Sequence, residues 1–237
     1  MPAKATTKRK PRITHPSGAR GRALQVVERL KQEYPLAATE LDHVDPFQLL
    51  VATILSAQTT DERVNMTTPA LFGRYPDAKS LAQAALPEVE ELIHPTGFFR
   101  SKSRAIVEMS QDLVARYEGQ VPPRMEDLVT LRGVGRKTAN VVLGAGFGLP
   151  GFAVDTHVTR LTNRLGLTRS KDPVQIETEI DDLVPPQEWT GLSLRLILHG
   201  RRVCDARNPH CDRCVLADVC PSAFKIGPWV KSRKAKS

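Results

Sequence analysis

An all-α fold is expected for this chain of 237 residues. Apolar side chains recur three or four positions apart through several segments, which is the periodicity of an amphipathic helix. No stretch of strand length alternates convincingly between apolar and polar residues, and the dipeptides Asn-Gly and Asp-Gly that mark tight hairpins are absent. Proline and glycine separate the periodic segments, so the pattern indicates roughly ten short helices.

The first expected helix runs from Ala23 to a stop at Pro35. A second is expected from Pro46, because Asp45-Pro46 places a proline at an early helical position. Its sequence, PFQLLVATILSAQ, is apolar nearly all round and therefore predicts a buried central helix. The stripe of the first helix is Leu24, Val27 and Leu30.

Two further amphipathic helices are expected later in the chain. One lies in SRAIVEMSQDLVARY and ends at Gly119, and the other ends at Pro185-Pro186. Their apolar stripes are Ile106, Met109, Leu113 and Tyr117 in the first, and Ile176, Ile180 and Leu183 in the second.

The net charge of +8 is concentrated in the tails. Residues 1–22 carry seven basic side chains and no acid, and residues 221–237 carry five basic side chains and no acid, which leaves the body between them at −4. Such tails are typical of flexible arms that bind any polyanion weakly. The charge therefore favours contact with nucleic acid without placing it on the folded body.

The chain offers no segment for membrane insertion or export. The N-terminus has no apolar run of the kind found in signal peptides, and the uncharged run 46–60 has 15 residues and is rich in polar side chains. With 41% apolar residues the chain can bury a substantial core. We expect a soluble, cytoplasmic protein, associated with the nucleoid if it is bacterial.

The four cysteines form a C-x6-C-x2-C-x5-C pattern close to the C-terminal end of the body. Disulfides are not expected in an intracellular protein, whereas four thiolates suit tetrahedral zinc or an iron–sulfur cluster. The proline directly after the last cysteine favours iron–sulfur slightly. Unrelated cysteines, or a redox pair in the C-x2-C segment, are the alternatives. The residues are Cys204, Cys211, Cys214 and Cys220.

The segment LRGVGRKTA, 131–139, predicts a tight turn followed by a helix. Gly133 and Gly135 allow a sharp turn and a close approach of the backbone to another surface. The amides of the turn and the start of the helix would form a phosphate cradle, with Arg136 and Lys137 beside it. The alternative is that the segment is a plain loop between two core helices, and the two adjacent cations do not favour this alternative.

Lys137 and Asp155 are the candidate catalytic residues. A lysine at a helix start is disfavoured by the helix dipole, and that dipole, Arg136 and partial burial would together lower its pKa toward neutrality. A neutral lysine can attack an electrophilic sugar carbon and form a Schiff base. The alternatives are a phosphate contact for Lys137 and a helix N-cap for Asp155, and the N-cap can coexist with a catalytic role.

Together these motifs resemble the endonuclease III family of the helix-hairpin-helix DNA glycosylase superfamily. The resemblance is carried by LRGVGRKTANVVL, by AVDTHVTRLTNRL and by the cysteine pattern, in that order, and is extended by LLVATILSAQTTDERVN, TGFFRSKSRAI and LILHGRRVC. It covers the body from about Ala23 to Pro221.

The resemblance implies two helical domains with the lesion bound in the cleft between them. A six-helix barrel domain with the helix-hairpin-helix would occupy residues 39–149. A domain that holds a [4Fe–4S] cluster would combine residues 23–38 with 150–222. A disordered basic tail, 1–22, and a basic C-terminal tail, 223–237, would flank them.

The resemblance also implies the activity of a bifunctional glycosylase and abasic-site lyase in base excision repair. Lys137 matches the nucleophile that attacks C1′ of an oxidised pyrimidine nucleotide in duplex DNA, and the strand is then cut by β-elimination. Asp155 matches the carboxylate that assists it. Duplex DNA with a damaged base or an abasic site is the expected partner of a monomer. The DNA-binding positions would be Gly133, Val134, Gly135, Arg136, Thr138, Gln58, Phe98 and Arg207.

Several residues depart from the family pattern. Arg132 stands where a proline is usual, Phe99-Arg100 replaces a more polar pair, and Asn208 and His210 replace basic residues, which leaves Arg207 as the permanent cation of that loop. Gln58 and Phe98, which match positions that fill the gap left by the flipped nucleotide, could instead be a core amide and a core aromatic.

Two other functions compete with this interpretation. An adenine glycosylase of the same superfamily would need an acid on the first buried helix, where this chain has Thr53 and no Asp or Glu between 46 and 60. A non-catalytic helix-hairpin-helix module would hold DNA without needing Lys137 and Asp155 together.

Overall fold

The computed structural model describes residues 13–230, and every regular element in that range is helical, which confirms the all-α prediction. None of the described helices is long and apolar enough to cross a membrane. The α-helices are α1 Ala19–Glu33, α2 Pro46–Leu55, α3 Asp61–Arg74, α4 Ala78–Ala82, α5 Leu86–Ile93, α6 Phe99–Tyr117, α7 Met125–Leu128, α8 Arg136–Val141, α9 Thr156–Arg164, α10 Pro173–Leu183 and α11 Trp189–Arg202. Shorter helical segments are η1 His94–Thr96, η2 Val142–Gly146, η3 Pro186–Glu188 and η4 Cys211–Arg213.

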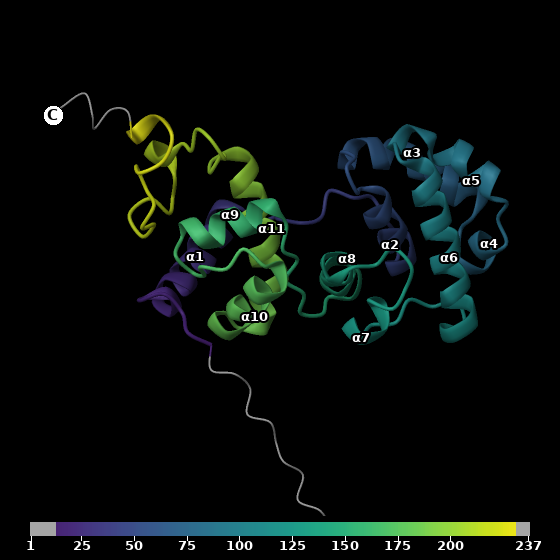
Figure 1. Cartoon of the computed structure of the whole chain (residues 1–237), viewed down its shortest axis with the longest axis horizontal. Coiled ribbons are helices and arrows are strands. Elements are labelled where there is room, and N and C mark those ends of the chain that lie inside the picture. The colour runs from purple at the N-terminus through teal and green to yellow at the C-terminus, as the bar shows by residue number, and fades with distance from the viewer. Residues whose placement is uncertain (1–12, 231–237) are drawn as a thin grey trace, which may run out of the picture.

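The helices form two lobes, as Figure 1 shows. One lobe holds α2 to α8, and its buried apolar residues run from Leu41 to Leu143. The other combines α1 with α9, α10 and α11, and its core joins residues 19–34 to 152–216. We call them the barrel lobe and the cluster lobe. The buried residues pass from one core to the other between Tyr34 and Leu41, and again between Leu143 and Phe152.

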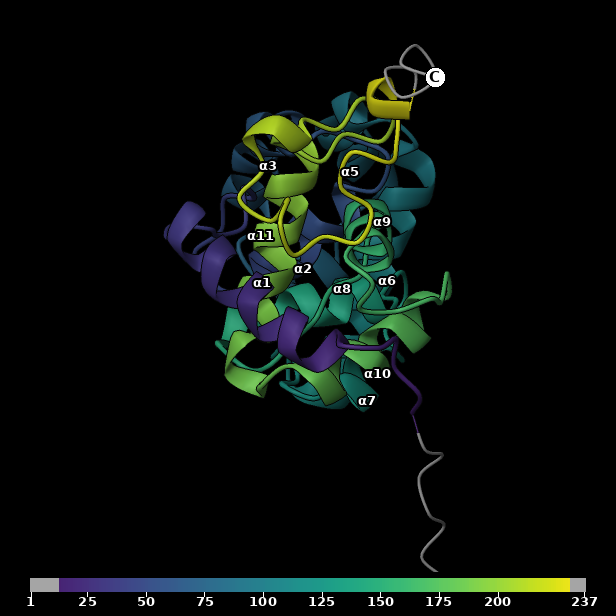
Figure 2. The same cartoon turned by 90° about the vertical axis from the view of Figure 1, so that its left-hand side faces the viewer.

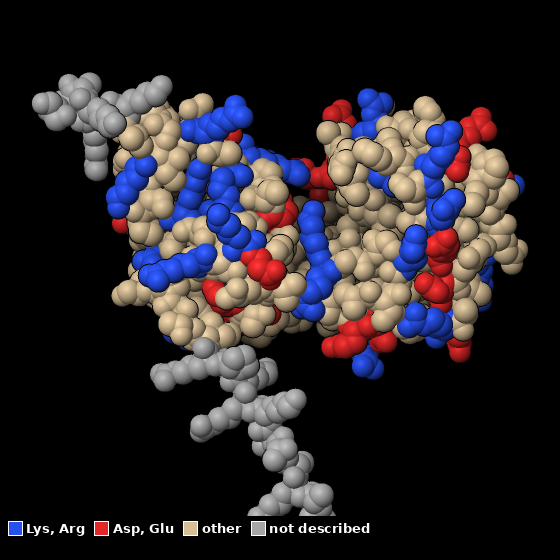
Figure 3. Space-filling view, in the orientation of Figure 1, with Lys and Arg blue, Asp and Glu red and all other residues tan. Residues whose placement is uncertain are grey.

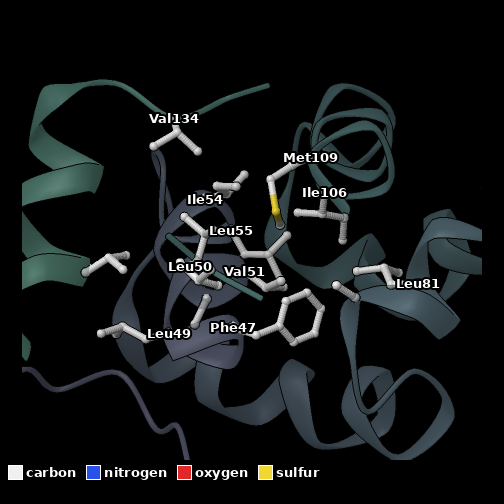
Figure 4. Packing of buried hydrophobic residues seen from close by; sticks show 14 of the residues in the cluster. Phe47, Leu49, Leu50, Val51, Ile54, Leu55, Leu81, Ile106, Met109 and Val134 are labelled. Atoms are coloured by element: carbon white, nitrogen blue, oxygen red, sulfur yellow. The ribbon is translucent and has the colours of Figure 1, made fainter. Parts of the chain in front are cut away.

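Helix α2 is the centre of the barrel lobe. Seven of its ten residues are buried, and they pack against α6 and the hairpin before α8 (Figure 4). Asp45 caps its first turn by accepting a hydrogen bond of 2.8 Å from the amide of Gln48, and Pro46 fits there because its missing N–H has no helical partner anyway. Each fully buried leucine or isoleucine contributes about 1.5–3 kcal/mol. The helix thus fixes the loop that follows it.

The ends of α6 and α10 follow the punctuation in the sequence, whereas α2 is shorter than expected. Helix α2 stops at Leu55 and not at Gln58, so residues 56–60 form a loop before α3. Helix α6 stops after Tyr117, where Glu118 and Gly119 turn into the left-handed region. Helix α10 stops before Pro185-Pro186, as expected.

Helix α1 differs from the sequence prediction in two ways. It begins at Ala19, four residues before the expected start. Its buried stripe is Ala19, Ala23, Val26, Val27 and Leu30, whereas Leu24 is 50% exposed. The prediction that Leu24 belongs to the stripe is wrong, because the buried face of the helix includes Ala23 and leaves Leu24 outside it. This face packs on α11 and α10 in the cluster lobe (Figure 2).

The expected tails lie mostly outside the described residues, which leave out 1–12 and 231–237. Inside the described range, His15 Nε2 lies 2.8 Å from a carboxylate oxygen of Asp182 on α10. At the other end, the indole N–H of Trp229 donates to the carbonyl of Pro209 at 2.8 Å. The described parts of both tails therefore contact the cluster lobe.

Candidate functional site

A cavity of about 130 Å³ lies between the two lobes and is lined by residues of both. Figure 3 shows the surface hollowed at this place, with Lys and Arg side chains along it. The polar residues of the lining are Thr39, Glu40, Thr53, Ser56, Asp61, Lys137, Asn140, Asp155, Thr190, Ser193 and Arg201. The two candidate catalytic residues thus face one cavity.

The turn before α8 carries Lys137 to the cavity. Gly133 adopts φ +76°, and a Cβ there would lie 3.1 Å from the Cβ of Ala105 on α6, so the turn packs tightly against the barrel. Val134 points into the barrel core (Figure 4) and its amide donates to the carbonyl of Leu131 at 3.2 Å. The side chain of Lys137, one residue into α8, is exposed.

Arg136 forms an ion pair with a residue of the protein itself. Its Nε donates to Oε2 of Glu177 on α10 at 3.1 Å, and Glu177 is 7% exposed. The cation expected beside the phosphate cradle is thus paired with a carboxylate of α10. The structure does not show the expected partial burial of Lys137. It does show the expected position of Lys137 at the start of a helix.

Asp155 is the N-cap of α9. Its Oδ1 accepts a hydrogen bond of 2.8 Å from the amide of Val158, and its Oδ2 lies 3.1 Å from Nδ1 of His157. The carboxylate remains in the lining of the cavity while it caps the helix. The structure thus shows that Asp155 caps α9. Capping uses one carboxylate oxygen and leaves the other for further contacts.

A short connection sets the position of Asp155 relative to Lys137. Asn140, one turn after Lys137, accepts a hydrogen bond of 3.1 Å on its side-chain oxygen from the amide of Phe152. A Cβ at Gly151 would lie 2.4 Å from the carbonyl oxygen of Asn140, so only glycine allows this approach. Nothing in the sequence motif alone pointed to Asn140 as the residue that joins the two segments.

Three charged residues in the cavity were missed by the sequence analysis. Arg201 on α11 reaches across to the barrel lobe, with NH1 at 2.6 Å from Glu40 and NH2 at 3.5 Å from Asp61. Arg201 lies in LILHGRRVC, a segment noted only for its resemblance. No local pattern signals this pairing, because its partners are about 140 to 160 positions away in sequence.

Gln58 and Phe98 lie at the surface in two adjacent loops of the barrel lobe. Both adopt left-handed backbone conformations, with φ of 56° and 47°. Phe98 is 65% exposed and Gln58 is also exposed, so the alternative that they are core residues is wrong. Exposed side chains on constrained loops are available to contact a ligand.

The remaining positions are also at or near the surface. Arg132 forms an ion pair with Glu108 at 3.2 Å. Arg207 is exposed, and its amide donates to Asp205 at 2.8 Å in a turn whose backbone hydrogen bonds lower the pKa of Asp205. Gly135 is exposed and Thr138 is half-buried.

The four cysteines line one largely apolar cavity and form no disulfide. Several N–H groups point at their sulfur atoms: Arg164 donates to Cys204 at 3.3 Å, and the amide of Leu216 donates to Cys214 at 3.4 Å. In the described residues, no group of three or more Cys, His, Asp or Glu is arranged to hold a single metal ion. Four free thiols around one shared cavity form a donor set that suits an iron–sulfur cluster.

His199 is a buried residue that contacts the cysteine site. Its Nδ1 lies 3.0 Å from the hydroxyl of Tyr34 and its Nε2 lies 3.3 Å from Sγ of Cys214. Burial lowers the pKa of His199 to about 4, so the ring is neutral and satisfies both contacts by accepting from Tyr34 and donating to sulfur. Burial likewise raises the pKa of the Cys214 thiol to about 11, so a thiolate here needs a metal.

Two family models match the chain. Residues 51–186 match the HhH-GPD superfamily of base excision DNA repair proteins, and residues 204–220 match the iron–sulfur binding domain of endonuclease III. The second match spans the four cysteines.

Similar proteins cover most of the chain. It is 56% identical over 203 residues to endonuclease III of Synechocystis sp., a match that covers 85% of this chain and 93% of that protein, and 41% identical over 200 residues to endonuclease III of Bacillus subtilis, covering 84% and 91%. Among solved structures, a non-covalent endonuclease III–DNA complex has a TM-score of 0.81, and a trapped endonuclease III–DNA covalent intermediate has 0.82. Both are 38% identical and cover 87% of this chain and 97% of theirs.

Proposed function

The chain belongs to the endonuclease III family of the HhH-GPD superfamily, and from that premise we propose how its own residues carry out the reaction. The reaction is that of a bifunctional DNA glycosylase and abasic-site lyase of base excision repair, acting on oxidised pyrimidines. The observation that carries our assignment of roles is that Lys137 and Asp155 line one cavity between the lobes.

Lys137 is the nucleophile in this proposal. Its neutral amine attacks C1′ of the extruded nucleotide, the bond from C1′ to the base nitrogen breaks, and the base leaves with the proton that the amine passes on through Asp155. The sugar ring then opens to give a Schiff base between Lys137 and C1′. Removal of a proton from C2′ breaks the bond from C3′ to its oxygen, which cuts the strand 3′ to the lesion.

Asp155 stabilises the positive charge that develops on the sugar during base loss and accepts the proton that the attacking amine releases. Support for this role comes from the place of Asp155 in the cavity lining, where one oxygen caps α9 and the other lies beside His157. Asn140 acts as a positioning residue, because its bond to the amide of Phe152 keeps the segment before Asp155 close to α8.

The DNA backbone is held by the hairpin in this proposal. The amides of Gly133 and Gly135 approach a phosphate, while Val134 anchors the turn in the barrel core. Arg136 exchanges its bond to Glu177 for a phosphate contact when DNA binds, and Thr138 and Arg207 add contacts at the edges. Gln58 and Phe98 fill the space that the extruded nucleotide leaves in the duplex.

The [4Fe–4S] cluster is held by Cys204, Cys211, Cys214 and Cys220. When bound, it would supply metal–thiolate bonds that cross-link residues 204–220 to one another, directly after α11. We propose that the cluster is structural, since its ligands lie in one lobe and the cavity with Lys137 is lined by other residues. The two lobes correspond in this proposal to the barrel domain and the cluster domain.

We propose that the protein acts as a monomer on duplex DNA with a damaged base or an abasic site, in the cytoplasm and, if it is bacterial, at the nucleoid. Both catalytic candidates come from a single chain, so a second copy has nothing to complete. Thr53, which stands where an adenine glycosylase would need an acid, donates its hydroxyl to the carbonyl of Leu49 at 2.7 Å and supplies no carboxylate.

Borohydride trapping tests the role of Lys137. With DNA that contains an oxidised pyrimidine, the wild type should give a covalent complex and Lys137→Ala should give none, because the Schiff base needs this amine. Lys171→Ala, which removes an exposed lysine outside the cavity, is the matched control and should trap normally. Undiminished trapping by Lys137→Ala would remove the proposed mechanism.

Asp155→Asn separates catalysis from capping. Asparagine is as good an N-cap as aspartate, so the melting temperature should change little. Base removal in single-turnover conditions should slow by about 100-fold or more, as expected for loss of a charged catalytic group, while DNA affinity changes much less. Equal losses in rate and affinity would indicate that Asp155 only shapes the site.

A further inference from the structure

Two surface loops of the barrel lobe share an unusual feature. Each carries one non-glycine residue in a left-handed conformation, Gln58 in the loop after α2 and Phe98 at the start of α6. This conformation is unfavourable for residues with a Cβ, and it persists only where the surroundings enforce it. Both residues are exposed, so packing of their own side chains in the core does not enforce it.

The side chain of Lys102 joins these loops. Its Nζ donates to the hydroxyl of Thr59 at 2.9 Å and to the carbonyl of Thr96 at 2.8 Å. The hydroxyl of Thr59 in turn donates to the same carbonyl of Thr96. Thr59 follows Gln58 directly, and Thr96 precedes Phe98 by two residues, so this junction ties together the backbones beside both strained residues.

Lys102 also holds Phe98 more directly. Its backbone amide donates to the carbonyl of Phe98 at 3.1 Å, so its two ends lie on either side of the turn at Gly97. The turn at Gly97, with φ +66°, is therefore bridged by one residue.

Burial of the Lys102 ammonium group at this position is energetically unfavourable. Lys102 is 5% exposed, and its burial lowers its pKa, with no carboxylate among residues 13–230 placed to offset that effect. A buried ammonium without an anion is unfavourable, and an apolar side chain of the same length would fill the space at lower cost. A role in fold stability alone does not explain why a cation stands here.

We infer that Lys102 is a positioning residue that holds Gln58 and Phe98 at a fixed spacing, so that both enter the duplex together when a nucleotide is extruded. This inference rests on the proposed function, in which these two residues fill the gap in the DNA. Through the junction with Thr59 and Thr96, the loops move as one body. Without it, each residue would enter separately, and the extruded state would form less often.

The test uses Lys102→Met, which keeps length and apolar bulk and removes the donor. The control is Ser110→Ala on the same helix, since Ser110 is fully buried and bonds only to Ile106 of its own helix. The probe is a duplex with an oxidised pyrimidine and 2-aminopurine in the opposite strand facing it. Borohydride-trapped complexes are compared, because the covalent link holds the DNA whatever the affinity.

Lys102→Met should trap about tenfold more slowly than wild type, a loss of the size expected for misplaced contacts, and its trapped complex should show weaker 2-aminopurine fluorescence. The control should match wild type in both. Wild-type fluorescence in the Lys102→Met complex, at any trapping rate, would overturn the inference, as would an equal loss in the control. Absence of trapping in the wild type would instead overturn the proposed function.

Thr59→Val is the second variant, and it replaces Lys102→Met in both measurements if Lys102→Met does not fold. It removes the hydroxyl at the junction without adding or burying a charge, and Thr59→Ser keeps the hydroxyl. Thr59→Val should share the slower trapping and the weaker fluorescence, and Thr59→Ser should restore both. Failure of Thr59→Val to change the fluorescence would count against the inference in the same way.

Discussion

Asp181 on α10 carries a carboxyl group that the fold solvates poorly. One of its oxygens is buried without a hydrogen-bond partner, and the nearby Glu177 repels negative charge. Burial, then this repulsion, raise the pKa of Asp181 to about 7, while Arg136 acts in the opposite direction. The residue therefore binds a proton in the folded protein at a pH where the unfolded chain has released it.

The sign of the effect on stability follows from this difference. As pH rises from about 4 to about 7, the unfolded chain gains from ionising Asp181 while the folded protein does not, so the free energy of unfolding falls. Partial exposure to solvent screens the effect, which leaves a cost on the order of 1–2 kcal/mol at pH 8. Asp181→Asn should avoid that cost.

We therefore expect Asp181→Asn to melt several degrees above wild type at pH 8 and close to it at pH 4.5. Thermal unfolding at both pH values checks this. Glu91→Gln, which changes an exposed carboxylate on α5, is the control and should follow wild type at both. A gap between Asp181→Asn and wild type that is the same at pH 4.5 and pH 8 would contradict the assignment.

At the scale of elements, the hairpin before α8 depends on two glycines for different reasons. Gly133 needs a positive φ and lies against Ala105, whereas Gly135 has φ −94° and no atom within 4 Å of a Cβ built on it. The first glycine is required by the fold. The second is required only if another molecule approaches it.

Gly133→Ala should lose about 1–2 kcal/mol of stability, because the left-handed backbone and the contact with Ala105 both become unfavourable. Gly135→Ala should keep the wild-type melting temperature and bind duplex DNA more weakly. Thermal unfolding and DNA titration at one fixed salt concentration separate the two. Wild-type affinity of Gly135→Ala would show that no phosphate comes close to this amide.

Helix ends and motif elements were well predicted from sequence, since local chemistry determines them. Asp45-Pro46 begins α2, Gly119 follows α6, and Asp155 caps α9. The stripe of α1 was misjudged because Leu24 and Ala23 both suit a helix, and only the partners α10 and α11 decide which faces inward.

The residues that sequence reasoning missed act through distant partners. Lys102 resembles any lysine of an amphipathic helix until Thr59 and Thr96 are brought to it. The pairing of Arg136 with Glu177 has no sequence signal either, because Glu177 lies 41 positions away. Burial and long-range pairing come from the tertiary fold, and one sequence carries no local signal for them.

For the whole molecule, the ion pairs of Arg201 with Glu40 and Asp61 connect the lobes across the cavity. These groups are partly exposed, so the pairs contribute little to stability, about 0–1 kcal/mol. Arg201→Gln should therefore leave the melting temperature almost unchanged. It should broaden the distribution of distances between a label on α5 and one on α10, measured by electron paramagnetic resonance. An unchanged distribution would show that the lobes are held by other contacts.

The metal centre belongs to one lobe, and its removal should affect the lobes unequally. The buried cluster of the barrel lobe contains no cysteine, whereas three of the four cysteines pack on the core of the cluster lobe. After oxidation and chelation of the iron, we expect most of the helical circular dichroism to remain and residues 204–220 to become sensitive to proteases. Cooperative loss of all helical signal would contradict this independence.

The cluster lobe is built from both ends of the described chain, with α1 in the first part and its partners after residue 150. On the ribosome, the barrel helices therefore emerge while α1 still lacks the surface it must cover. The groove for the damaged nucleotide is complete only once α11, which carries Arg201, has been translated. A polypeptide cut short inside the barrel thus lacks Asp155 as well as the metal ligands.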